Sequence, residues 1–87
     1  MIIEVTQEDI AKGISRSTCA CPVALAVSRH LGLNWVSFET VTTLNGTKYR
    51  LPSKAIEFVQ FFDVGREVKP FSFQLEPSLE VRYGYGS

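Results

Sequence analysis

Hydrophobic residues recur along this chain with two spacings, one typical of strands and one typical of helices. Runs of β-branched, aromatic or alternating apolar residues predict strands, whereas apolar residues three or four positions apart predict helices. The sequence therefore predicts strands over residues 2–5, 35–44, 47–51 and 68–75, helices over 22–31 and 54–64, and one or two helical turns within 7–14.

Proline and glycine mark where several of these elements begin and end. Pro22 suits the first position of a helix, because that position needs no N–H donor. Cys21 is then expected near the N-cap, and Gly32 is expected to end the helix. The Asn45-Gly46 pair predicts a tight hairpin turn, since both residues accept a positive φ angle.

The predicted elements follow the order β-α-β-β-α-β, which is the split βαβ order of ferredoxin-like domains. We therefore expect a small α+β domain, ferredoxin-like or with a similar antiparallel sheet that carries two helices on one face. Residues 1–75 are expected to form this single domain. Residues 76–87 alternate more weakly and predict either a C-terminal tail or an added strand.

Two large apolar residues lie off the core faces of the predicted helices. On a helical wheel with about 100° per residue, Leu25 points away from Val27, and Phe61 lies off the face that holds Phe58. Contiguous exposed apolar surface on a soluble protein marks a binding surface. We therefore predict a homo-oligomer whose interface includes Leu25, Phe61 and, in the aromatic tail, Tyr83. The alternative is that loops or the tail cover the two helical residues.

The charge balance and the lengths of the apolar runs exclude several classes of protein. Nine basic residues offset nine acidic ones among 87, so the chain lacks the basic excess typical of DNA- or RNA-binding domains. The longest apolar run, residues 22–27, is far shorter than the ~20 residues of a membrane span. Residues 1–9 lack the basic and apolar regions of a secretory signal. Two cysteines one residue apart are poor disulfide partners, which favours reduced thiols in a cytoplasmic protein.

The two cysteines and the single histidine do not predict a metal site or a catalytic site. A structural zinc ion needs four ligands, and one Cys-x-Cys pair with one histidine falls short. A thiolate at Cys21 would be stabilised by the helix N-terminus. His30, however, lies nine residues further along the same helix, about 13 Å away, and is too far to act as its base. We therefore predict no enzyme activity, no metal and no cofactor, and we expect both cysteines to pack around a helix cap.

The loop before the first predicted helix carries groups that bind anions. Arg16 offers a bidentate donor, two hydroxyl side chains follow it, and the N–H groups after Cys21 lie at a helix N-terminus. An aromatic ring from the predicted hairpin would stack on a base beside another cation. This pattern predicts a site for a small anionic ligand, and its expected residues are Arg16, Ser17, Thr18, Cys21, Trp35, Tyr49 and Arg50. The alternative is an ordinary capping loop, because serine and threonine favour helix caps.

Three segments carry a resemblance: CPVALAV at 21–27, KYRLP at 48–52 and AIEFVQFFDVGREVKPFSFQL at 55–75. With them the chain resembles a diffuse group of small uncharacterised proteins from bacteriophages and bacterial chromosomes. The resemblance implies a protein in the cytoplasm of an infected bacterial host, where small neutral phage proteins often antagonise host defence. We therefore expect a non-enzymatic, phage-type binding protein that sequesters a small anionic ligand such as an immune signalling nucleotide. The alternative is a protein–protein inhibitor or an assembly subunit with no small-molecule ligand.

Overall fold

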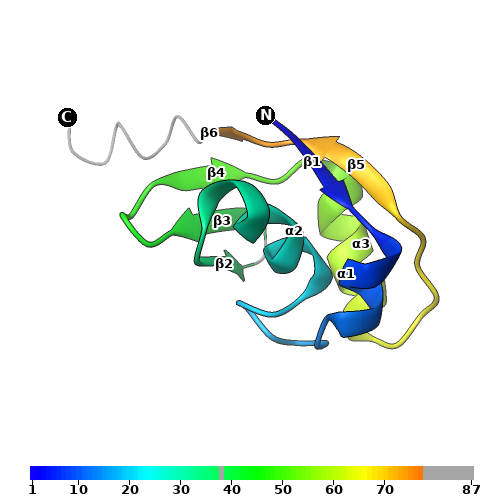
Figure 1. Cartoon of the computed structure of the whole chain (residues 1–87). Helices are drawn as coiled ribbons and strands as arrows, with labels where there is room; N and C mark the ends of the chain where they lie inside the picture. Colours follow the sequence, from blue (N-terminus) through cyan, green and yellow to red (C-terminus); the bar gives the residue numbers. More distant parts are fainter. Residues whose placement is uncertain (38, 78–87) are drawn as a thin grey trace.

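The computed structural model describes residues 1–37 and 39–77 of the chain. Its elements are shown in Figure 1 and follow one another as β1 (Ile2–Val5), α1 (Gln7–Lys12), α2 (Pro22–Leu31), β2 (Asn34–Ser37), β3 (Thr40–Thr43), β4 (Lys48–Arg50), α3 (Ser53–Asp63), β5 (Phe71–Gln74) and β6 (Glu76–Pro77). Helices and antiparallel strands mixed in this way make a small α+β fold, so the predicted fold class is confirmed.

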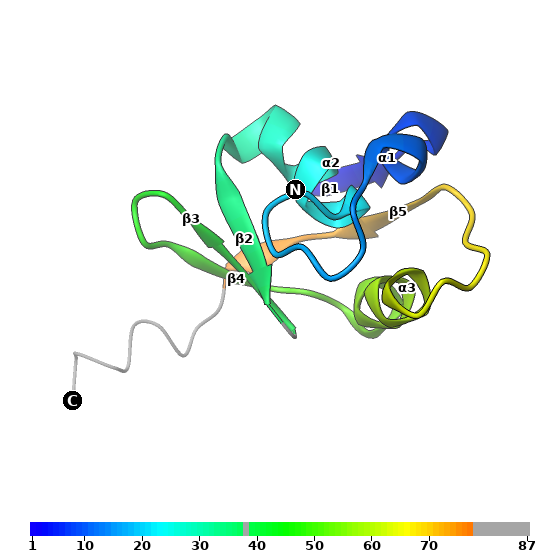
Figure 2. The ribbon, with the colours of Figure 1, turned by 90° about the horizontal axis from the view of Figure 1, so that it is seen from below.

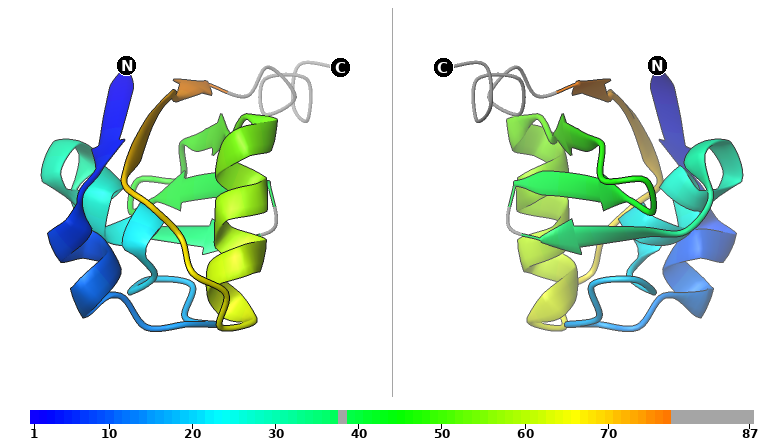
Figure 3. Two further views of the ribbon diagram at one scale, coloured as in Figure 1. Left: turned by 90° about the vertical axis from the view of Figure 1, so that its right-hand side faces the viewer. Right: turned by 90° about the vertical axis from the view of Figure 1, so that its left-hand side faces the viewer.

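The strands form two antiparallel sheets. β1 pairs with β5, and the other four strands form a second sheet in the order β2-β3-β4-β6. Buried Leu75 joins β5 to β6, so the chain passes directly from the smaller sheet to the larger one. This arrangement differs from the single sheet that the β-α-β-β-α-β order suggests. Figures 2 and 3 also show α3 on the opposite side of β5 from α1 and α2, so the two longer helices do not share one face.

The difference arises because the apolar run 35–44 forms two strands instead of one. The chain reverses between Ser37 and Thr40, where the Thr40 hydroxyl donates to the Ser37 carbonyl at 3.1 Å. β2, β3 and β4 thus form a meander of sequence neighbours, as consecutive strands commonly do, and β1 pairs with β5 instead. The prediction of one strand was wrong because this reversal contains neither glycine nor proline.

Local capping groups explain where α1 and α2 begin and end. Before α1, the Thr6 hydroxyl accepts from the Asp9 N–H at 3.2 Å, and the Asp9 carboxylate accepts from the Thr6 N–H at 2.9 Å. This reciprocal pair is a capping box. α2 begins at Pro22, as predicted, and is followed by Gly32. The φ angle of Gly32 is 75°, which glycine adopts without the steric cost that a side chain would add.

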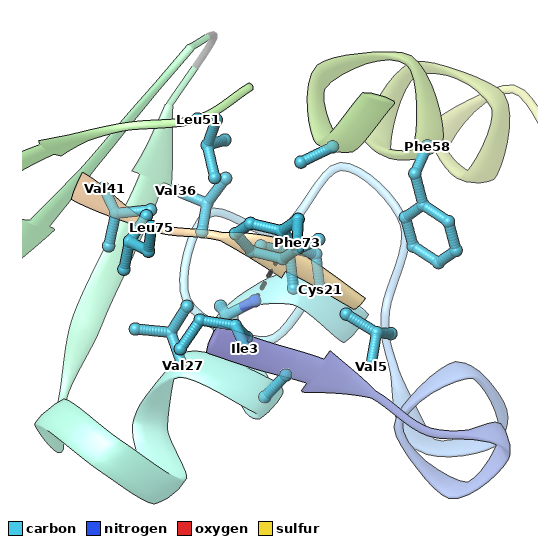
Figure 4. Packing of buried hydrophobic residues seen from close by; sticks show 14 residues of the cluster. Ile3, Val5, Cys21, Val27, Val36, Val41, Leu51, Phe58, Phe73 and Leu75 are labelled. Atoms are coloured by element: carbon cyan, nitrogen blue, oxygen red, sulfur yellow. Dashed lines mark hydrogen bonds between the residues drawn. The ribbon is translucent and has the colours of Figure 1, made fainter. Parts of the chain in front are cut away.

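The apolar core lies where α2, α3 and the inner faces of both sheets meet (Figure 4). Phe58 of α3 stacks on Phe71 with 4.7 Å between ring centroids, and Phe71 stacks on Phe73 at 5.6 Å. Phe73 of the smaller sheet and Val41 of the larger sheet belong to the same buried cluster, so the two sheets share one core. Its buried apolar residues include Ile3, Val5, Cys21, Val23, Ala24, Ala26, Val27, Val36, Val41, Leu51, Ala55, Phe58, Phe73 and Leu75.

An ion pair joins α1 to α2 and β1. The Arg29 guanidinium donates to the two carboxylate oxygens of Asp9, at 2.6 and 2.7 Å, and to the Glu4 carbonyl at 2.8 Å. Burial alone would raise the pKa of Asp9, but the hydrogen bonds from Arg29 and Thr6 outweigh it and hold that pKa below its usual value. The pair therefore fixes α1 against α2 and is strongest while Asp9 is ionised.

The chain after β5 continues into the larger sheet. Glu76 and Pro77 form β6, which pairs with Arg50 and Tyr49 of β4. A strand is thus added at the edge of the sheet, at the start of the segment for which the sequence predicts a tail or a strand. The rest of that segment, residues 78–87, lies outside the described residues.

Candidate functional site

The predicted anion-binding loop uses its polar groups to hold itself in place. The Arg16 backbone N–H donates to a carboxylate oxygen of Asp63 at 2.8 Å. The Ser17 hydroxyl accepts from the Ala20 N–H at 3.0 Å, and the Thr18 carbonyl accepts from the Val36 N–H at 2.6 Å. The loop is therefore attached to the end of α3 on one side and to the outer edge of β2 on the other. Figure 3 shows it running between these elements.

The N-terminus of α2 is buried beneath this loop. Cys21 is 2% exposed, and its sulfur accepts from the Ala24 N–H at 3.4 Å. The Leu25 N–H is bonded to the Cys21 carbonyl at 3.0 Å. Burial raises the pKa of the Cys21 thiol, so the thiol stays protonated near neutral pH. The backbone donors that the sequence predicts for an anion thus meet a sulfur and the core, and Cys21 is a packed cap.

Two of the predicted ligand residues share the outer face of the larger sheet, and a third does not. Residues opposite one another in antiparallel strands share a face, and alternate residues of β2 and β3 face the core. Tyr49 lies on the inner face and packs, half-buried, against the core. The opposite face holds two cross-strand rows, Trp35–Thr42–Lys48 and Ser37–Thr40–Arg50. We call these six residues the sheet face.

The predicted interface residues have different surroundings. Phe61 is 38% exposed, as the helical wheel predicts. Leu25 is half-buried, because it lies in the first half of α2, where its neighbours Ala24 and Ala26 are buried. Tyr83 lies outside the described residues. The three therefore do not form one surface in the part of the chain that the structure describes.

Besides Phe61, an apolar residue at the end of α3 and another on the segment bonded to that end are exposed. Val64 follows the end of α3 and is 64% exposed, and Ile14 follows α1 and is 59% exposed. The Arg66 guanidinium lies over the Phe61 ring, 4.8 Å from its centroid. We call Ile14, Phe61, Val64 and Arg66 the Phe61 patch. An apolar residue just beyond the end of α1 is the signal that would have selected Ile14.

Shallow hollows in the surface do not gather the predicted ligand residues. One hollow of about 250 Å³ is lined by Tyr49 together with Leu31 and residues 43–45 and 47 of the β3–β4 hairpin. Another, of about 470 Å³, lies between the start of α1 and the start of β5. Neither is lined by residues of the Arg16 loop or by Trp35, so these cavities do not support the predicted site.

The described residues also bear on metal and membrane binding. Within them, no group of three or more histidine, cysteine, aspartate or glutamate side chains is placed to hold a metal ion. Cys19 is exposed and Cys21 is buried, and both are free thiols. No helix within residues 1–37 and 39–77 is long and apolar enough to cross a membrane.

No protein-family model, no curated protein and no solved structure matches this chain.

Proposed function

We propose that this protein is a non-enzymatic binding protein that self-associates, with the Phe61 patch as the interface between its copies. The observation that carries the proposal is that three large apolar side chains are exposed on two segments held together at the end of α3. A chain of 87 residues has a small core, so few large apolar side chains can be left outside it. An exposed apolar cluster on such a chain is typical of a protein-binding surface.

A hydrogen bond between distant segments holds the patch together. Ile14 and Arg16 belong to one turn, in which the Ser17 N–H donates to the Ile14 carbonyl at 3.4 Å. The Asp63 carboxylate accepts from the Arg16 N–H at 2.8 Å and so fixes this turn at the end of α3. The apolar side chains are thus presented by anchored backbone, which lowers the entropy lost when a partner binds.

The charges around Phe61 favour a second copy of this chain as the partner. Arg66 lies over the Phe61 ring, and Asp63 precedes Arg66 by three residues in the chain, so a cation and a carboxylate both occur at the end of α3. In a two-fold interface the same patch meets itself. A two-fold axis near Phe61 would bring the arginine of one copy to the aspartate of the other, and it would bury the two rings against each other.

The hydrogen bonds that hold the Arg16 loop in place favour this protein-binding function over a nucleotide site at Arg16. A ligand phosphate there would compete with the Asp63 carboxylate for the Arg16 N–H and would find the α2 N-terminus covered. The hypothesis of a sequestered signalling nucleotide therefore stays a prediction at that loop. The antagonism of host defence, and the location in an infected bacterial host, rest on the resemblance to phage proteins alone.

The experiment is a measurement of molar mass by light scattering during size-exclusion chromatography at micromolar concentration. We expect a mass of at least two chains of 9.7 kDa. Phe61→Ser should shift the protein to the monomer, because it removes the central ring of the patch. Leu44→Ser is the matched control, since Leu44 is 72% exposed and lies on the distant β3–β4 hairpin; this variant should keep the wild-type mass.

Two results would contradict the proposal. A wild-type protein that stays monomeric at every concentration would exclude self-association. A monomeric Leu44→Ser variant beside an oligomeric Phe61→Ser variant would place the interface on the hairpin instead. Circular dichroism on each variant separates a lost interface from a lost fold.

A further inference from the structure

The sheet face offers a second binding surface, distinct from the Phe61 patch. It holds the only tryptophan of the chain, Trp35, which is 38% exposed. Trp35 lies opposite Thr42 on β3, and Thr42 lies opposite Lys48 on β4. The hairpin register therefore places an aromatic ring, a hydroxyl and an ammonium group in one row across three strands.

The spacing within this row is set by the sheet. Neighbouring strands lie about 4.8 Å apart, so the backbones of Trp35 and Lys48 are separated by about 10 Å, with Thr42 between them. This separation is comparable with the length of a nucleoside monophosphate from its base to its phosphate. The flexible lysine side chain can adjust the remaining distance.

From this juxtaposition we propose that the sheet face binds a mononucleotide, with its base stacked on Trp35 and its phosphate held by Lys48. The Thr42 hydroxyl lies where the sugar would pass and can donate to it or accept from it. The inference deepens the proposed function and rests on its premise of a non-enzymatic binding protein, because it names the class of ligand. It also moves the expected anion site from the Arg16 loop to the sheet.

Charge complementarity supports the Lys48 row as the phosphate position. In the neighbouring row, Arg50 lies opposite Glu76 of β6, so a carboxylate stands beside that arginine. Within the described residues, the row of Trp35, Thr42 and Lys48 contains no carboxylate. A phosphate would therefore meet less repulsion at Lys48 than at Arg50, and the second cation would add a longer-range attraction.

A small nucleotide fits the sheet face better than a single-stranded nucleic acid does. Proteins that bind single strands combine several stacking rings with a basic groove. Here the sheet face has a single aromatic ring among its six residues, and the chain has no net charge. One base and one phosphate match what this surface offers.

The experiment is a titration of the intrinsic fluorescence of Trp35 with AMP, GMP and their cyclic monophosphates. Stacking of a base on the only indole should quench its emission and saturate. Trp35→Ala, followed by calorimetry, should weaken binding by about five- to a hundredfold, which is the range of base–aromatic stacking. Lys48→Gln should weaken binding about threefold or more, because it removes an exposed ionic contact.

Two charge-matched controls locate the site. Lys54→Gln removes another exposed lysine, in the first turn of α3, and Arg16→Gln removes the arginine of the predicted loop. Both should bind AMP as the wild type does. A loss of binding in Arg16→Gln with no loss in Lys48→Gln would return the site to the loop and overturn this inference.

Two further arms complete the test. No saturable quenching by any nucleotide in the panel would refute the mononucleotide site. Much tighter binding of a ten-residue oligothymidylate than of thymidine monophosphate would also refute it, because the ligand would then be a single strand. The monomeric Phe61→Ser variant should be quenched as the wild type is. A failure of self-association is therefore distinguishable from a failure of nucleotide binding.

Discussion

Replacing Asp9 by asparagine tests how strongly α1 is fixed to the rest of the fold. Removing one partner of a buried ion pair costs about 3–5 kcal/mol. The Asp9 side chain is 5% exposed, but that of Arg29 is 47% exposed, so water and salt screen part of the interaction. Asparagine also keeps an oxygen that can accept from Thr6. We therefore expect a loss of about 1–2 kcal/mol.

The assay is thermal unfolding followed by circular dichroism. For a chain of this size, a loss of that magnitude lowers Tm by roughly 5–15 °C at neutral pH. Glu8→Gln is the matched control, because the Glu8–Lys12 pair is exposed on the surface of α1, with side chains 73% and 70% exposed. A surface pair of this kind contributes little, and the control should unfold close to the wild-type temperature.

The pH dependence of thermal unfolding tests the sign of the stabilisation by Asp9. Folding lowers the pKa of Asp9, so the folded chain binds this proton more weakly than the unfolded chain does. The stabilisation by Asp9 is therefore complete above the unfolded pKa of about 3.9 and declines as the pH falls through the folded value. The gap in Tm between wild type and Asp9→Asn should narrow on acidification. Equal Tm values at pH 7, or a gap that widens in acid, would refute the reasoning.

Three other predictions concern the α1–α2 loop. Gly13→Ala should destabilise the fold by about 1–3 kcal/mol in urea unfolding, because its Cβ would lie 2.6 Å from two ring carbons of Pro22; an unchanged midpoint would contradict this close approach. A thiol reagent at neutral pH should label one of the two cysteines in the folded protein, because Cys21 is buried with a raised pKa; two labelled thiols would show that the cap is open. Arg16→Gly should leave stability unchanged or raise it by up to about 1 kcal/mol, because the φ angle of Arg16 is 63°; a clear loss would mean that its side chain stabilises the loop.

The parts of the fold that the sequence predicted are those with local signals. α2 was predictable to the residue, because Pro22 suits its first position and Gly32 follows its last. The reversal between β2 and β3 was not predictable in this way. The Thr40 hydroxyl helps to close it without glycine or proline, and apolar residues alternate on both sides. The division into two sheets follows from that reversal and depends on long-range pairing.

The candidate site shows the same division between local and long-range information. The exposure of Phe61 follows from the spacing of apolar residues within one helix. Its grouping with Ile14 depends on the hydrogen bond from Arg16 to Asp63, which joins residues 47 positions apart. The place of Cys21 at the N-cap of α2 followed from Pro22, but the choice between a packed cap and an anion site did not, because a cysteine before a helix is compatible with a buried or an open cap.

The central claim is that copies of this chain meet through the Phe61 patch. Its most direct test is a series of two-dimensional amide NMR spectra recorded from low micromolar to millimolar protein concentration. We predict concentration-dependent shifts or line broadening at residues 13–17 and 60–66, with the β3–β4 hairpin around Leu44 unchanged. Spectra that do not change with concentration, or changes confined to the hairpin, would contradict the claim.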